Sequence, residues 1–130
     1  MGSYPCHCCG RLVHDAPPGS YQICPVCGWE DDLIQLRWPQ CESGANRLSL
    51  IEAQRLYRRR ETADHDLALT ARTASAPWPI DVGFRPADPE VDNFEPTRVM
   101  EADWPEDRTL LYWWRPRFWR RPEGCAGSER

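Results

Sequence analysis

The amino-acid sequence predicts a small α+β fold: a cysteine-bearing hairpin, one main helix at about residues 50–62, and a C-terminal extension that contributes a strand. Three observations predict it. Two Cys-x2-Cys pairs lie near the N-terminus, a segment with helix-capping residues follows them, and the second half is rich in proline and tryptophan. At 130 residues the chain is long enough for one modest domain.

The cysteine pairs have the spacing of a zinc site. The pattern C-x2-C-x14-C-x2-C is made by Cys6, Cys9, Cys24 and Cys27, and it is typical of four-thiolate zinc-ribbon sites. Each pair continues into a glycine, which permits the positive φ that closes such a turn. We call these turns, Cys6–Gly10 and Cys24–Gly28, the first and second knuckles. We expect one structural zinc ion per chain, because four protein thiolates leave no open position for water or substrate.

The cysteines have two alternative uses. Iron in a rubredoxin-like site would take the same four thiolates. A disulfide framework fits less well, because seven cysteines is an odd number and the N-terminus lacks the profile of a signal peptide. Cysteines that bind a metal instead of forming disulfides indicate a reducing compartment, so we expect a cytoplasmic protein. No apolar run is long enough for a membrane span, and we expect no membrane association.

Several motifs in residues 1–60 resemble one protein family. They are Tyr4-Pro5-Cys6-His7-Cys8-Cys9-Gly10, Ile23-Cys24-Pro25-Val26-Cys27, Trp29-Glu30-Asp31-Asp32 and Gly44-Ala45-Asn46-Arg47-Leu48-Ser49-Leu50. In these motifs the chain is similar to the bacterial cysteine-rich CPCC proteins. The resemblance implies a small metal-binding domain and brings no established reaction with it. One position departs from the family pattern, because His7 stands where the family has a proline between the first two cysteines.

The segment between the knuckles predicts a hairpin. Strands at Arg11–Val13 and Tyr21–Ile23 would flank a turn at residues 15–20 and bring both knuckles to one end. His14 is expected to be an exposed residue at a strand end, with metal ligation as the alternative. Trp29 follows the second knuckle, and we expect it either to cover the metal site, shielding the metal–sulfur bonds from water, or to anchor the module in the core.

Residues 30–41 carry carboxylates, a short apolar segment and a further cysteine. Glu30-Asp31-Asp32 is expected to cap a turn or pair with arginine, and catalysis is the alternative. Residues 33–38 fit either a short strand or a helical turn that ends at Pro39. Cys41 is expected to be a spare thiol.

The main helix is predicted by its N-terminal signal. Ser49 and Glu52 form a capping box. An apolar stripe follows at Ala53, Leu56 and Tyr57, and Asn46-Arg47 are expected to tie the helix back to the acidic triplet. Arg58-Arg59-Arg60 is expected to be a solvated helix end, with phosphate binding as the alternative.

The chain divides into a zinc-binding module at residues 1–62 and an extension at residues 63–130. Residues 61–76 predict a linker, residues 77–105 are acidic and proline-rich, and a basic segment containing Cys125 follows. The opposite charges and the spaced aromatic residues predict that the extension packs on the module as one compact domain. Residues 109–115 alternate in a way that predicts a strand.

The segment after that strand alternates arginine with aromatic residues. It could contact a partner, and the candidate partner-binding residues are Trp113, Arg115, Arg117, Phe118, Trp119, Arg120 and Arg121. Such a composition stacks bases and binds phosphate. It equally fits cation–π packing against the acidic segment, and Trp113 could instead belong to the core.

Three hypotheses of function follow. The leading one is a zinc-binding protein without catalytic activity that binds another protein, in the manner of a toxin-neutralising immunity protein or an adaptor. The first alternative is a nucleic-acid-binding protein that uses residues 115–121, although the net charge of −4 argues mildly against it. The second alternative is a thiol or redox enzyme that uses Cys8. We expect Cys8 instead to be a packed bystander.

Overall fold

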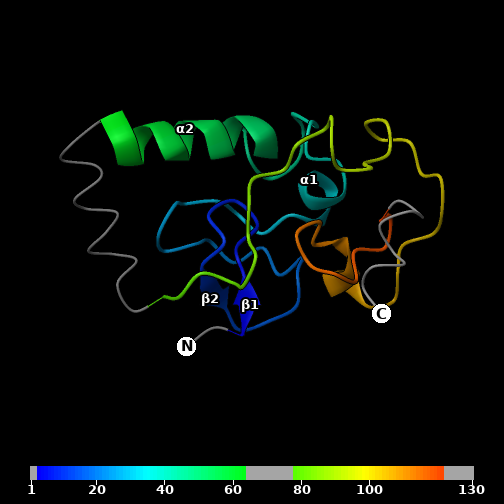
Figure 1. Ribbon diagram of the computed structural model, residues 1–130, viewed down its shortest axis with the longest axis horizontal. Helices are drawn as coiled ribbons and strands as arrows, with labels where there is room; N and C mark the ends of the chain where they lie inside the picture. Colours follow the sequence, from blue (N-terminus) through cyan, green and yellow to red (C-terminus); the bar gives the residue numbers. More distant parts are fainter. Residues whose placement is uncertain (1–2, 64–77, 122–130) are drawn as a thin grey trace.

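A computed structural model of the chain describes residues 3–63 and 78–121. Figure 1 shows a long helix along one edge, a short helix near the centre and a small strand pair at the opposite edge. In chain order, the elements are β1 (Tyr4–Pro5), β2 (Leu12–His14), α1 (Leu33–Arg37), α2 (Leu50–Ala63) and the 3-10 helix η1 (Arg108–Leu111). The predicted linker at residues 61–76 falls mostly outside the described residues, and Cys125 lies outside them altogether.

The strand pair differs from the predicted hairpin. β1 and β2 pair antiparallel on either side of the first knuckle, with Tyr4 opposite His14 and Pro5 opposite Leu12. The predicted return strand at residues 21–23 is wrong: Ile23 forms an isolated bridge with Glu30 across the second knuckle. Each knuckle is thus closed by its own flanking residues, which meet at little cost in loop entropy because few residues separate them.

The segment at residues 33–38 is helical. The side chain of Asp32 caps α1 by accepting hydrogen bonds from the backbone N–H groups of Ile34 and Gln35. This capping satisfies amide groups that the short helix cannot pair internally.

The long helix α2 begins with the predicted capping box. The N–H of Glu52 donates to Oγ of Ser49 at 3.2 Å, and the Glu52 carboxylate lies 3.3 Å from the same hydroxyl. The predicted apolar stripe differs from the buried face, however. Leu50, Ile51 and Gln54 are buried, whereas Ala53, Leu56 and Tyr57 are only half-buried.

The predicted strand at residues 109–115 is wrong. η1 and a series of turns occupy this part of the chain, and the Asp107 side chain accepts from the N–H of Thr109 at the start of η1. Four consecutive residues, Leu111–Trp114, are buried. A strand sends neighbouring side chains to opposite faces, whereas tight turns let all four enter one core.

The extension lies across the N-terminal elements. The backbone N–H of Leu12 donates to the carbonyl of Pro79 at 2.8 Å, and the Gln54 side chain accepts from the N–H of Ala87 at 3.0 Å. Figure 1 shows residues 78–90 running from β2 past α2 toward α1. Residues 79 and 87 thus contact β2 and α2.

The described residues hold no membrane-spanning helix, because none of their helices is both long and apolar enough.

Candidate metal centre

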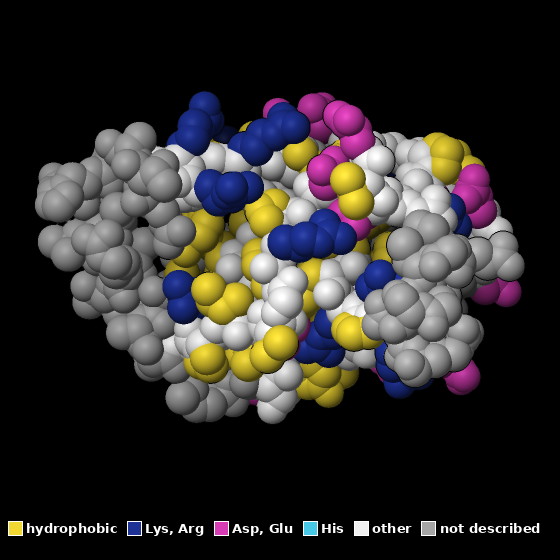
Figure 2. Space-filling view, in the orientation of Figure 1, with side chains coloured by type: hydrophobic (Ala, Val, Ile, Leu, Met, Phe, Trp, Pro, Cys, Tyr) yellow, Lys and Arg dark blue, Asp and Glu magenta, His cyan; other side chains and the backbone are white. Residues whose placement is uncertain are grey.

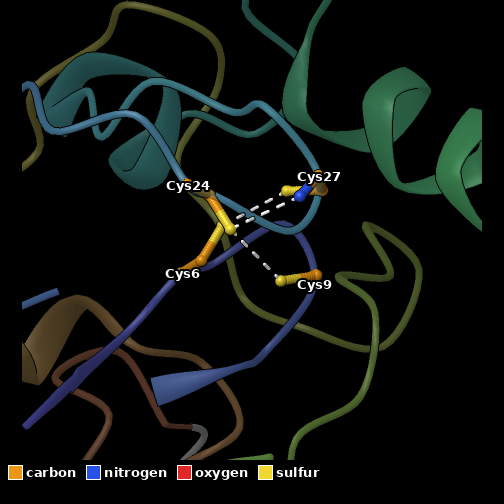
Figure 3. Close-up of side chains that lie close together, drawn as sticks. All are labelled: Cys6, Cys9, Cys24 and Cys27. Carbon is orange, nitrogen blue, oxygen red and sulfur yellow. Dashed lines mark hydrogen bonds between the residues drawn. The ribbon is translucent and has the colours of Figure 1, made fainter. Parts of the chain in front are cut away.

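Four thiols converge between the two knuckles. The sulfur atoms of Cys6, Cys9, Cys24 and Cys27 all lie within 4.8 Å of one another, and Figure 3 shows the side chains pointing inward from two separate loops. Two sulfur pairs, Cys6–Cys27 and Cys9–Cys24, are 3.6 and 3.7 Å apart. The structure thus brings together the four cysteines that the spacing singles out, and their thiolates would hold one metal ion.

Both knuckles have the same backbone form. Gly10 and Gly28 each have φ of +83°, a region that side-chain-bearing residues adopt only at a cost. Their N–H groups donate to the carbonyls of Cys6 and Cys24 at 2.7 and 3.0 Å. These bonds close each turn and hold its two cysteines on one side, as predicted from the glycines.

Backbone amides also point at the sulfur atoms. The N–H of Cys8 donates to Sγ of Cys6 at 3.4 Å, and the N–H of Val26 donates to Sγ of Cys24 at 3.3 Å. Such bonds stabilise negative charge on sulfur, which is the form that binds a metal.

The electrostatics of the cluster would favour a cation among its four sulfur atoms. Hydrogen bonds from the neighbouring thiols, above all Cys27, lower the pKa of Cys24, whereas burial raises the pKa of Cys6 and the contact with Cys24 raises that of Cys9. Four thiolates this close and this buried would repel one another strongly without a compensating charge. The donor set therefore fits a thiophilic metal ion bound with four protein ligands and no open position.

Trp29 follows the second knuckle, is buried in the core and bonds to His7 of the first knuckle. Its indole Nε1 donates to Nε2 of His7 at 2.7 Å, and both side chains are buried. Burial lowers the pKa of His7 to about 4. His7 is therefore neutral, and its Nε2 is engaged with Trp29 rather than directed at a metal.

The acidic triplet has structural roles. Asp31 accepts from the N–H groups of Gly19 and Ser20 and from the Ser20 hydroxyl, so it closes the turn before the second knuckle. Asp32 caps α1. The backbone of Glu30 forms a pair of 2.9 Å hydrogen bonds with the Asn46 amide. The expected tie between the loop before α2 and the triplet is confirmed at Asn46.

Two further predicted positions are buried. His14 is only 2% exposed, so the expectation of an exposed strand end is wrong, and its Nε2 has no hydrogen-bond partner among the described residues. Cys41 is buried, and its Sγ lies 3.3 Å from the carbonyl of Ser43. Neither side chain belongs to the four-thiol cluster.

Cys8 lies beside the cluster without joining it. Its side chain is buried, and it lines a groove next to Cys27. The Cys8 thiol contacts that of Cys27, but it is not one of the four sulfur atoms that converge.

The candidate partner-binding residues separate into two groups. Trp113 and Phe118 are buried in the core. The structure places the remaining members of the set at intermediate or greater exposure: Arg115, Arg117, Trp119, Arg120 and Arg121.

Most of the guanidinium groups in that segment are engaged. Arg115 pairs with Asp81 at 2.9 Å and Arg120 with Glu101 at 2.8 Å, while Arg121 donates to the carbonyl of Arg115. The acidic and basic segments thus contact each other, as the charge distribution predicted. A partner could reach Arg117 and the outer part of Trp119.

Arg37 joins α1 to the extension, and no sequence motif points to this role. Its side chain is buried and donates two hydrogen bonds to Glu95, at 2.7 and 2.8 Å. Its guanidinium carbon also lies within 5.0 Å of three indole rings, those of Trp38, Trp104 and Trp119. Residues 37 and 95 are 58 positions apart, and patterns in the local sequence cannot predict a contact over that separation.

The comparison with known families agrees with these features. No curated protein matches the chain. A family model described as cysteine-rich CPCC matches residues 4–76, which is more than half of the chain and contains all four clustered cysteines. The chain belongs to the cysteine-rich CPCC family.

Proposed function

We propose that this chain is a structural zinc protein without catalytic activity, which acts by binding another protein as an adaptor or as a toxin-neutralising immunity protein. One zinc ion per chain would be held by Cys6, Cys9, Cys24 and Cys27. The convergence of these four thiols within 4.8 Å is the observation that carries the proposal. Tetrahedral coordination by four thiolates is the usual form of a structural zinc site.

The surroundings of the cluster support a structural role. The polar groups nearest the knuckles hold chain segments together: His7 accepts from Trp29, Asp31 closes a turn, and Asn46 is paired with the backbone of Glu30. A closed four-thiolate site also offers a substrate no coordination position. Zinc at this site would therefore stabilise the fold and not react.

The burial of aromatic rings and the pairing of arginines in the C-terminal extension favour a protein over a nucleic acid as the partner. Base stacking needs exposed aromatic faces, but Trp113 and Phe118 are buried. Arg115 and Arg120 already have carboxylate partners. The nucleic-acid hypothesis would have to rely on Arg117 and part of Trp119.

Affinity capture from an extract of the native cell tests the proposal. Zinc-loaded chain used as bait in nuclease-treated extract should retain one protein in near-stoichiometric amount, and the Cys24→Ser bait should not retain it. A neighbouring gene that encodes a toxin would support the immunity role. Retention of nucleic acid that falls steeply with salt would instead support the nucleic-acid alternative.

A further inference from the structure

Cys27 is more accessible than the other cysteines of the four-thiol cluster. It is half-buried, whereas Cys6, Cys9 and Cys24 are buried. Figure 3 shows Cys27 on the side of the cluster that faces α2. A reagent that approaches from the side of α2 therefore meets Cys27 before the other three cysteines.

An open groove of about 380 Å³ leads to Cys27. It lies between the second knuckle and α2, and its walls include Trp29, Leu56 and Tyr57. Figure 2 shows hydrophobic side chains exposed beside α2, in keeping with such apolar walls. A neutral molecule enters an apolar groove more easily than an ion, because the ion loses its hydration there. The groove therefore gives a small neutral reagent a path to Cys27.

A fifth thiol lies in the same groove. Cys8 lines it together with Cys27, and the two thiols are in contact. Cys8 belongs to the first knuckle and Cys27 to the second, so the pair joins the two loops that form the metal site. Because the Cys8 sulfur is not among the four that converge, a metal ion bound by those four would leave its thiol free.

This freedom distinguishes Cys8 from Cys6, which is also close to Cys27. The sulfur atoms of Cys6 and Cys27 are 3.6 Å apart. As a metal ligand, however, the Cys6 sulfur would have its lone pair engaged by the metal, and that lone pair is what attacks another sulfur atom in disulfide formation. Cys8 is thus the neighbour of Cys27 that is able to react while the metal is bound.

We propose that Cys8 and Cys27 form a peroxide-sensitive thiol pair, whose oxidation to a disulfide releases the metal. The inference rests on the four-thiolate metal site of the proposed function and goes beyond that function, because it adds a modification site. The reaction is stoichiometric and requires no catalytic activity of the chain.

Hydrogen peroxide is the oxidant, and the reaction has two steps. First, the thiolate sulfur of Cys27 attacks one peroxide oxygen, the O–O bond breaks, and Cys27 becomes a sulfenic acid while hydroxide leaves. The Cys8 sulfur then attacks the Cys27 sulfur, so that the S–S bond forms and the S–O bond breaks, and the departing hydroxide takes the Cys8 thiol proton to form water. The two sulfur atoms together lose two electrons, which reduce the peroxide. Three thiolates then remain for the metal, and its affinity falls because thiolates are the sulfur ligands that bind it.

Treatment of the zinc-loaded chain with equimolar hydrogen peroxide tests the pair. A chromogenic chelator should report zinc release from the wild type, and dithiothreitol should restore zinc binding. Trypsin leaves Cys8 in residues 1–11 and Cys27 in residues 12–37, so the disulfide should join these two peptides, and tandem mass spectrometry identifies the linked cysteines.

Cys8→Ser should keep its zinc on purification and lose this disulfide on oxidation. Its Cys27 should instead proceed to sulfinic acid, which thiols do not reduce, so dithiothreitol should no longer restore zinc binding. The matched control is Cys41→Ser, which removes a buried thiol outside both the groove and the four-thiol cluster and should behave as the wild type. Thermal unfolding of each variant before oxidation verifies that the fold is intact.

A disulfide between Cys6 and Cys27 in the wild type would overturn the proposal, as would zinc release without any disulfide. Equal and reversible zinc release from Cys8→Ser and the wild type would also overturn it, while leaving the metal site in place. The metal site of the proposed function fails separately, when the purified wild-type chain binds no zinc.

Discussion

His7 stands between the first two cysteines, at the position where the resembled family has proline. The structure uses it as a buried acceptor for Trp29, with Nδ1 3.7 Å from a carboxylate oxygen of Asp31. Burial lowers its pKa from 6.5 to about 4. A buried neutral imidazole is thus part of the packing around the metal centre.

This depressed pKa predicts a pH dependence of stability. Below pH 6.5 the unfolded chain binds a proton at His7 that the folded chain does not bind until about pH 4, so stability falls as the pH falls through this window. The loss approaches about 1.4 kcal/mol per pH unit. His7→Gln, whose amide oxygen can still accept from Trp29, should lose less. Denaturant unfolding from pH 7 down to the lowest pH at which both proteins keep their zinc measures the difference, and parallel curves would contradict the assignment.

Trp113 was a candidate contact residue, and its position predicts an effect on stability instead. Its ring is 1% exposed and packs near Phe84, Phe94 and Trp114, while its Nε1 donates to the carbonyl of Arg85. Trp113→Ala should therefore cost about 3–5 kcal/mol of unfolding free energy. Arg117→Ala, at an exposed position, should stay within about 0.5 kcal/mol. An unchanged melting temperature for Trp113→Ala would contradict this packing.

At the scale of elements, the sequence predicts turns and helix caps, but it does not predict which strands pair. The knuckles and the Ser49 capping box depend on residues a few positions apart, so their spacing predicts their form. Local spacing does not predict which segment pairs with β2, because residues 4–5 and residues 21–23 are both close enough in sequence to do so. Residues 109–115 have the side-chain alternation of a strand, yet four consecutive residues, Leu111–Trp114, are buried in the core.

The contact between α1 and the extension gives the third prediction. Arg37→Met would leave the Glu95 carboxylate buried without its cation, which typically costs about 3–5 kcal/mol. The double variant with Glu95→Gln should recover part of that loss, because the unpaired charge is gone. Chemical denaturation of the two single variants and the double variant measures the coupling. Strictly additive losses would show that the pair does not connect these elements.

At the scale of the whole molecule, the described part of the extension packs against the N-terminal module. It supplies the partners of Arg37, Gln54 and Arg11, and its rings fill the core. Opposite charge in the two parts of the extension predicted that they would meet. The particular partners could not be predicted, because they follow from the path of a chain that has little regular structure.

Limited proteolysis tests whether module and extension form one cooperative unit. Trypsin should cut slowly after both Arg37 and Arg108 in the zinc-loaded protein, and chelation of the metal should speed both cuts together. The reason is that both guanidinium groups pack on the ring of Trp104 in the extension. Rapid cleavage between Ala76 and Pro105 that releases a stable zinc-bound fragment would show two independent parts.

The metal content of the purified chain tests the central claim most directly. Elemental analysis should give one zinc ion per chain for the wild type and for Cys8→Ser, because Cys8 lies outside the four-thiol cluster. Cys24→Ser should lose the metal together with the stability of residues 1–40, because metal binding contributes folding free energy to two knuckles that have little regular structure around them. A wild-type chain that is free of metal yet normally stable would contradict the account, and so would loss of zinc from Cys8→Ser.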